Sequence, residues 1–155
     1  MDELFTKLNQ LASGLILEKA RFGRAGILSL WVETKSLRAF AEKIAAEKSL
    51  KLDWLEDFQV AKMDNALVIS YWLRSYEDTT QLVFRCSVEL AKKDAEIEIP
   101  SLRDLWPMIA PFENDSGELF GIRYTLAGSP VEVKRNLLPE SVQDFPLRHQ
   151  REARK

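Results

Sequence analysis

The chain has 155 residues, of which 46% are hydrophobic and 30% charged, and a formal net charge of −2. This composition is typical of one soluble globular domain, and it excludes a strongly basic nucleic-acid-binding surface and a membrane-spanning segment. The single cysteine, Cys86, and the single histidine, His149, exclude an internal disulfide, an all-cysteine iron–sulfur cluster and zinc sites built from four Cys or Cys₂His₂ ligands.

The N-terminal residues predict a short helix. Apolar side chains between positions 4 and 12 recur at helical spacing, and Gly14 follows as a stop signal. The stretch before them lacks the basic and apolar regions of a secretory signal. We therefore expect a cytoplasmic protein that reaches a membrane only through a partner, without inserting into it directly.

A β-hairpin is predicted next. Two apolar runs, Leu15–Phe22 and Ile27–Glu33, flank the four-residue sequence Gly-Arg-Ala-Gly. Two glycines could also belong to a phosphate-binding loop, but such a loop leads into a helix, whereas Gly26 leads into a strand. The pattern therefore favours a turn.

The middle of the chain predicts one helix followed by three strands. Apolar residues from Leu37 to Ala45 recur at i, i+3, i+4 and i+7, which is typical of an amphipathic helix. The strands are expected at Phe58–Met63, Ala66–Tyr76 and Gln81–Leu90. In the last strand apolar residues, Cys86 among them, alternate with polar ones, and Val83 breaks the pattern on the polar side.

This order of elements predicts an α+β fold. We expect a two-layer sandwich of helix, two strands, helix and three strands, with a mixed or antiparallel sheet covered on one face by helices. The charged stretch 91–96 marks a boundary, which divides the chain into an α+β domain at residues 1–99 and an extended C-terminal segment at residues 100–155. The basic end of the chain, from Arg148 to Lys155, is expected to be a frayed terminus.

The C-terminal segment carries most of the functional information. It mixes aromatic residues with prolines, glycines and acidic residues, so it is too broken for a long helix and too apolar for a free tail. Ser101–Asp104 has the form of a capping box and predicts a short helix that Pro107 or Pro111 limits. Such a segment is expected to lie along a surface with a fixed path.

Three carboxylates, Glu113, Asp115 and Glu118, are close in sequence within this segment. They could act as a general acid and base, hold a cation, form a solvated turn, or face Arg and Lys side chains of a partner. A catalytic role would require a pocket and further groups that the sequence does not supply. A small enzyme using these carboxylates is therefore the least favoured of these hypotheses.

The same segment resembles a known family. The motifs that carry the resemblance are Pro100-Ser101, Asp104–Pro107, Glu113, Glu118–Tyr124, Gly128–Pro130, Lys134-Arg135, Leu138–Glu140 and Pro146–Arg148. Their order and spacing are similar to the signature of the C subunit of NADH:quinone oxidoreductase, the thirty-kilodalton subunit of respiratory complex I. Relatives of this family occur in energy-converting nickel–iron hydrogenases.

This resemblance implies a scaffold role without catalytic residues. Family members hold no cofactor and lie in the peripheral arm, so iron–sulfur clusters, flavin, nickel and quinone are expected only in partner subunits. The partners implied are the hydrogenase-like large subunit and the small iron–sulfur subunit. The protein would then be peripherally associated with the inner face of the cell membrane, and residues 100–155 would pack on residues 1–99 and on a neighbouring subunit.

A set of partner-binding residues follows from the resemblance. Trp106 and Phe120 are expected as anchors, with packing on the chain's own body as the alternative, while Gly121 would allow close backbone approach and Arg148 would bind a carboxylate. The full set is Trp106, Glu113, Asp115, Glu118, Phe120, Gly121, Arg123, Pro139, Pro146 and Arg148.

The chain departs from the family pattern at three informative positions. Asn114 replaces the central Arg of an E-R-E motif, Pro111 replaces a Trp, and Ser129 replaces the His of a G-H-P motif. Two alternatives to membership of complex I therefore stay open: an equivalent subunit of an energy-converting nickel–iron hydrogenase, and a stand-alone protein-binding module with the same fold.

Overall fold

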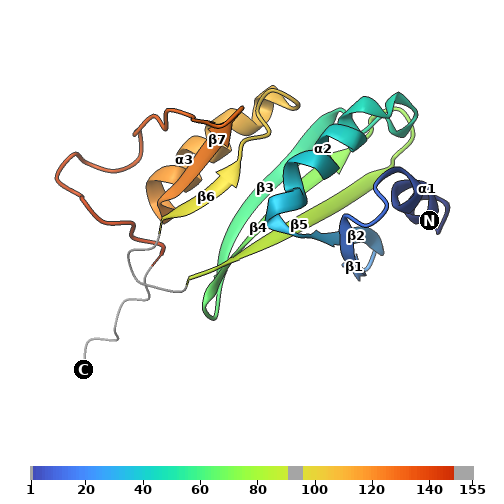
Figure 1. The fold of residues 1–155 in the computed structure, drawn as a ribbon, viewed down its shortest axis with the longest axis horizontal. Coiled ribbons are helices and arrows are strands. Elements are labelled where there is room, and N and C mark those ends of the chain that lie inside the picture. Colours follow the sequence, from blue (N-terminus) through green and yellow to red (C-terminus); the bar gives the residue numbers. More distant parts are fainter. Residues whose placement is uncertain (1, 91–95, 149–155) are drawn as a thin grey trace.

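The computed structural model describes residues 2–90 and 96–148, and its fold is shown in Figure 1. A five-stranded sheet has the strand order β1-β2-β5-β4-β3, and a smaller three-stranded sheet has the order β6-β7-β8. The basic tail predicted beyond Arg148, with His149, lies outside the described residues, as does most of the predicted boundary stretch.

The strands come in consecutive groups that short helices separate. The strands are β1 (Ile16–Phe22), β2 (Ile27–Val32), β3 (Trp54–Met63), β4 (Ala66–Arg74), β5 (Gln81–Glu89), β6 (Ile97–Pro100), β7 (Ile122–Leu126) and β8 (Ser129–Pro130). The α-helices are α1 (Asp2–Leu11), α2 (Leu37–Ala46) and α3 (Ala110–Phe120). Short 3₁₀ helices are η1 (Thr34–Ser36), η2 (Lys48–Leu50) and η3 (Pro107–Ile109).

The large sheet is mixed. Its neighbouring strands are antiparallel except for β2 and β5, which run parallel and pair Leu28 with Leu82 through Trp31 with Arg85. The α+β class and the predicted succession of helix, hairpin, helix and three strands are therefore confirmed. The mixed alternative, rather than the antiparallel one, is correct.

One face of the large sheet carries the main core. Alternating residues of β2, β4 and β5 point to this face, and α1 and α2 cover it with Leu8, Phe40 and Ile44. Cys86 belongs to this core, and burial raises the pKa of its thiol to about 12. Cys86 is therefore a packing residue, as the alternation in its strand predicts.

The C-terminal segment forms a second unit that shares the same core. Ile99, Leu102, Ile109 and Tyr124 are buried in one cluster with the residues of the large sheet. Figure 1 shows α3, β6 and β7 beside β3. Since β6 begins at Ile97, the boundary predicted after residue 99 falls inside a strand.

The prediction of a short helix limited by proline is wrong. Residues 101–104 form no helix, and Pro107 and Pro111 lie in the first turns of η3 and α3. Proline is favoured there because the first helical N–H groups have no intrahelical acceptor, so the missing N–H costs nothing. The prolines therefore begin helices instead of ending one.

The opposite face of the large sheet is not uniformly polar. Val83 and Ser29 are both 0% exposed, although neither belongs to the main core cluster. The cross-strand register pairs these two residues and pairs Val83 with Trp72. The apolar break noted at Val83 therefore marks a second, smaller packed group on this face.

Candidate functional site

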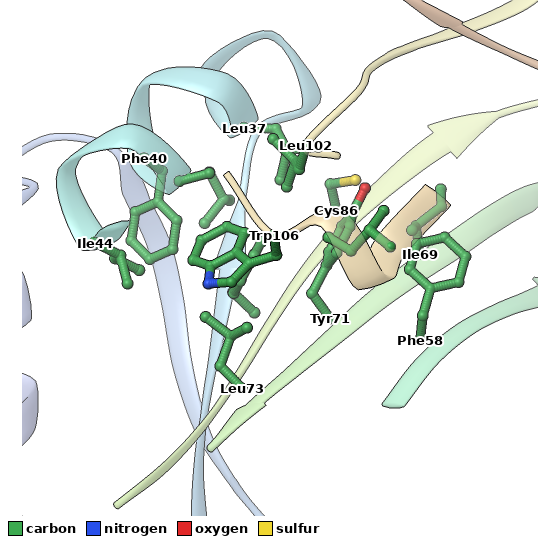
Figure 2. Packing of buried hydrophobic residues seen from close by; sticks show 14 of the residues in the cluster. Leu37, Phe40, Ile44, Phe58, Ile69, Tyr71, Leu73, Cys86, Leu102 and Trp106 are labelled. Carbon is green, nitrogen blue, oxygen red and sulfur yellow. The ribbon is translucent and has the colours of Figure 1, made fainter. Parts of the chain in front are cut away.

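Trp106 anchors the C-terminal unit to the large sheet. Its side chain is 2% exposed, and its indole Nε1 donates a 3.0 Å hydrogen bond to the carbonyl of Leu52. Figure 2 shows the indole among Phe40 and Ile44 of α2 and Leu73 of β4. Of the two roles considered for Trp106, packing on the chain's own body is the one this structure contains.

Glu113 is buried where α3 meets the loop after β6. Its side chain is 0% exposed and accepts hydrogen bonds from Ser101 Oγ at 2.8 Å, the Leu102 amide at 3.0 Å and Arg103 Nε at 2.8 Å. The carboxylate thus joins a loop backbone, a hydroxyl and a cation in one site. The idea of a solvated carboxylate turn is wrong for Glu113.

Ser116 and Tyr124 extend this polar group and were missed by sequence reasoning. The two hydroxyls are 2.7 Å apart, and Ser116 also donates to the Phe112 carbonyl in the preceding turn of α3. Burial raises the pKa of Tyr124 well above its usual value, so the phenol is neutral. The available signal was a serine three residues after Glu113, on the same helical side.

Glu118 organises the loop that follows β8. Its carboxylate accepts hydrogen bonds from the amides of Asn136 at 2.9 Å, Leu137 at 3.0 Å and Leu138 at 2.7 Å, with Arg135 at 3.9 Å. Burial acts to raise the pKa of Glu118, but the amide hydrogen bonds outweigh it and the pKa is lowered. Glu118 therefore holds a loop of its own chain as an ionised carboxylate.

Gly121, Phe145 and Arg148 close the C-terminal end of α3. Gly121 has φ +69°, and a Cβ atom there would lie 2.5 Å from the ring of Phe145. Arg148 donates hydrogen bonds at 2.8 Å from Nε to the Phe120 carbonyl and from Nη2 to the Gly121 carbonyl. The close approach expected at Gly121 thus exists within the chain, and the Arg148 guanidinium binds helix-end carbonyls.

Phe120 is buried and belongs to the main core cluster. The other predicted partner-binding residues lie nearer the surface. Asp115 is half-buried, Arg123, Pro139 and Pro146 are exposed, and Arg123 pairs with Glu96 at 3.3 Å. For these four residues, partner binding stays a prediction, and their side chains are accessible enough to contact a partner.

An open cavity of about 560 Å³ lies between the small sheet and the C-terminal loop. Its walls include Glu96, Arg123, Arg135, Gly121 and Phe145. The charged side chains on this wall are mostly exposed. The apolar part of the lining comes from β6, β7 and the C-terminal loop, with Ile97, Ile122 and Val133 among its residues. The C-terminal segment itself supplies most of the lining residues, so the cavity belongs to this segment and is not a separate site.

An ion pair that sequence reasoning missed connects α2 to the C-terminal unit. Arg38 donates two hydrogen bonds to the Asp104 carboxylate, at 2.6 and 2.7 Å, and one to the Ser101 carbonyl at 3.0 Å. The hydrogen bond with Arg38 lowers the pKa of Asp104. Asp104 therefore acts as a bidentate acceptor rather than as a helix cap.

Neither a metal-binding cluster nor a membrane-spanning helix occurs in the described part of the chain. Within residues 2–90 and 96–148, no group of three or more His, Cys, Asp or Glu side chains is placed to hold a metal ion. Over those same residues no helix has the length and hydropathy needed to cross a bilayer.

The family of the chain follows from comparison with known proteins. The family described as "Respiratory-chain NADH dehydrogenase, 30 Kd subunit" matches residues 30–155. The chain belongs to this family. Its members are subunits of a multi-subunit respiratory complex, so this chain is an oxidoreductase-complex subunit with protein partners, and the resemblance seen in its motifs is confirmed.

Individual relatives agree with the family. The C subunit of NADH-quinone oxidoreductase from Roseiflexus sp. (strain RS-1) is 27% identical over 149 residues, covering 92% of this chain and 80% of the relative. The C subunit of the same enzyme from Francisella tularensis subsp. holarctica (strain FTNF002-00 / FTA) is 27% identical over 107 residues. That match covers 68% of this chain and 46% of the Francisella protein, so it spans about half of that relative.

A solved structure shares the fold. It is described as the membrane-bound sulfane sulfur reductase (MBS), an archaeal respiratory membrane complex. One of its chains aligns with a TM-score of 0.66 and 17% identity, covering 95% of this chain and 79% of that chain. At this identity the likeness supports the fold alone.

Proposed function

We propose that this chain is a cofactor-free scaffold subunit in the peripheral arm of a membrane-associated NADH:quinone oxidoreductase. It docks on the hydrogenase-like large subunit, with the small iron–sulfur subunit nearby, and supports electron transfer between redox centres in those partners. Its place is the inner face of the cell membrane, reached through the partners. The observation that carries the proposal is the family match over residues 30–155.

The polar groups of the C-terminal unit are consistent with a scaffold. Glu113 and Glu118 each accept three hydrogen bonds from this chain, which leaves them holding loops in place. A general acid or base instead needs a proton-transfer position that a substrate can reach. The small-enzyme hypothesis thus finds no support in these two carboxylates.

One departure from the family motif favours an equivalent subunit of an energy-converting nickel–iron hydrogenase as the second candidate. Asn114 stands at the central Arg position, and its buried Oδ1 has no hydrogen-bond partner among the described residues. Asn114 Oδ1 needs a hydrogen-bond donor from the partner, whereas the arginine of the family motif needs an acceptor. The two residues therefore suit different partner surfaces. The stand-alone binding module is the remaining alternative.

The test is purification of the native complex from membranes through an affinity tag on this chain. The proposal expects a hydrogenase-like large subunit in stoichiometric amount, NADH:quinone activity in the preparation, and no iron, nickel or flavin in the chain alone. Hydrogen-dependent activity with nickel in the complex would establish the second candidate. Absence of any large subunit, or stoichiometric metal in the isolated chain, would contradict the scaffold.

A further inference from the structure

We propose that the open face of the five-stranded sheet docks a partner protein that inserts an acidic side chain, flanked by apolar ones, against Arg85. The open face is the side of the sheet opposite α1 and α2, and its central patch consists of Phe22, Ser29, Trp31, Trp72, Val83 and Arg85. This inference rests on the proposed function, since it assigns the chain a surface for one of its partner subunits.

Cross-strand register brings these residues together. Ser29 pairs with Val83 and Trp31 with Arg85 across the parallel β2–β5 ladder, while Val83 pairs with Trp72 across β4–β5. Strand side chains alternate between faces, so paired residues share a side of the sheet. Five of the six patch residues therefore lie on three adjacent strands, and Phe22 adds the neighbouring strand β1.

The aromatic rings lie over the centre of the patch. The rings of Phe22 on β1 and Trp72 on β4 meet edge to face at 5.0 Å, although β2 and β5 run between their strands. The Arg85 guanidinium lies 4.9 Å from the Phe22 ring centre and 5.9 Å from that of Trp31. Ser29 and Val83 are fully buried beneath this layer, while Phe22 is still 43% exposed.

Three hydrogen-bond donors in the patch have no acceptor. Arg85 Nε, Trp72 Nε1 and Ser29 Oγ are buried atoms without a hydrogen-bond partner anywhere in the described chain. Burying a donor without an acceptor is unfavourable, and these three atoms leave the patch with an excess of donors over acceptors. Arg85 as a residue is only half-buried, so its guanidinium is the donor group of the patch that a docked partner can reach. Partial burial also lowers the pKa of Arg85, although the guanidinium stays charged.

A carboxylate is the acceptor that best matches this chemistry. The neighbouring cation on the same face, Arg74, is already paired with Glu56 at 2.9 Å, whereas Arg85 has no ion pair within the described residues. A planar guanidinium held by ring faces is preorganised for a bidentate carboxylate. Charge complementarity therefore selects an acidic partner segment.

The aromatic content selects a protein rather than a small anion. Trp, Tyr and Arg are the residues that most often dominate binding energy at protein interfaces, and a free anion gains nothing from apolar surface. Farther along the same face Trp54 and Tyr76 form a second edge-to-face pair at 5.4 Å, with Arg74 over Tyr76. The partner segment is thus expected to run across the strands from β1 toward β3.

Site-specific cross-linking in membranes tests the proposal with Arg85 intact. The variant Ser87→benzoylphenylalanine places a photoreactive group at an exposed position two residues from Arg85 on the same face of β5. Lys43→benzoylphenylalanine, at an exposed position of α2 on the covered side of the sheet, is the matched control. We expect the first variant to cross-link to a peptide of another protein with an Asp or Glu among apolar residues, and the control to miss that peptide.

The outcomes separate this inference from the proposed function. A cross-link to such a peptide in a protein other than the large subunit and the small iron–sulfur subunit would support the docking face while contradicting the proposed partners. A complex that contains the large subunit but gives no protein cross-link at position 87 would overturn the docking face and leave the proposed function standing. Cross-links only to lipid, or only to a second copy of this chain, would also overturn it.

Charge reversal gives an independent measure. Arg85→Glu is expected to raise the dissociation constant for the cross-linked partner at least tenfold, and Arg85→Lys to cause a smaller loss because one bidentate contact is missing. Lys43→Glu makes the same change in charge on the covered side and is expected to change the constant less than twofold. Equal binding by Arg85→Glu and the unaltered chain, with matching circular-dichroism spectra, would overturn the proposal.

Discussion

Glu113 and Glu118 are both buried carboxylates, but different structures depend on them. Glu113 joins α3 to the loop after β6 and is paired with Arg103, whereas Glu118 holds amides of the loop after β8. Both residues are glutamates, so the hydrogen-bond donors around each carboxylate decide its role. Substitutions at these two positions are therefore expected to have distinct effects.

Replacing Glu113 is expected to destabilise the whole fold. Glu113→Ala leaves the Leu102 amide and Ser101 hydroxyl without their acceptor and Arg103 without its counter-ion, at a cost of about 3 kcal/mol. Urea unfolding followed by tryptophan fluorescence measures the change. Asp115→Ala, at a half-buried position on the same helix, is the control and is expected to cost less than about 1 kcal/mol.

Glu118 is expected to give the fold an acid-sensitive loop. Its pKa in the folded protein is lower than the ordinary value of 4.5, so the stabilisation is fully present above pH 4.5 and is lost as the pH falls through the folded pKa. The melting temperature of Glu118→Gln should lie below that of the unaltered chain at pH 7, and the difference should shrink below pH 4.5. Glu140→Gln, at an exposed position of the same loop, should show no such convergence; a constant difference for Glu118→Gln would contradict this assignment.

At the scale of elements, the C-terminal end of α3 is tightly packed. Gly121 adopts a left-handed conformation directly after the helix, and the Phe145 ring packs where a side chain would be. Gly128 has a similar φ of +78°, but nothing lies within 4 Å of its Cβ position. Alanine substitutions at these two positions can therefore distinguish the cost of backbone strain from the cost of a steric clash.

Gly121→Ala is expected to cost more than about 2 kcal/mol and Gly128→Ala about 1 kcal/mol, since only the first adds a clash to the left-handed strain. The clash should also release the Phe145 ring and the chain near it. Limited proteolysis followed by mass spectrometry should then show new cleavage between residues 133 and 148 in Gly121→Ala alone. Similar cleavage of both variants would mean that strain, rather than the ring, decides the effect.

Elements with a clear apolar period could be predicted from the sequence, and α3 could not. In α2 the buried residues are Leu37, Phe40, Ala41 and Ile44. Their spacing of i, i+3, i+4 and i+7 is that of an amphipathic helix, so the sequence alone predicts this helix. In α3 the buried positions include Glu113, Ser116, Gly117 and Glu118, so the inward face is largely polar. The hydrophobic period disappears there because hydrogen-bonded groups fill the positions that apolar side chains normally occupy.

The same reasoning explains what was missed at the sites. Periodicity showed which face each strand residue occupies, but strand order decides which residues meet, and the β2–β5 pairing is not encoded in local pattern. Val83 was the visible sign of the open face, while Phe22, Trp31 and Trp72 looked like separate strand residues. For Trp106, the sequence left core packing and partner binding equally open, and only the tertiary contacts distinguish them.

At the scale of the whole molecule, Trp106 joins the two units of the fold. Trp106→Ala removes a buried ring between α2 and the large sheet and leaves the Leu52 carbonyl without its donor, so we expect a loss of about 4 kcal/mol. Thermal unfolding by calorimetry measures this loss. Trp54→Ala, at a residue that is 44% exposed, is the matched control and should cost less than about 1 kcal/mol; equal losses would mean that Trp106 does not join the units.

The single parallel ladder in the large sheet also constrains how the chain folds. The β3–β4 and β4–β5 pairs join strands that are consecutive in sequence, as does the β1–β2 hairpin, so these pairs close short loops. The β2–β5 ladder instead joins residues 28–31 to residues 82–85, with α2, β3 and β4 between them in the chain. Loop-closure entropy disfavours the early formation of such a pairing. We therefore expect the N-terminal hairpin to join the β3–β4–β5 meander late in folding, so that the open-face patch is completed only in that step.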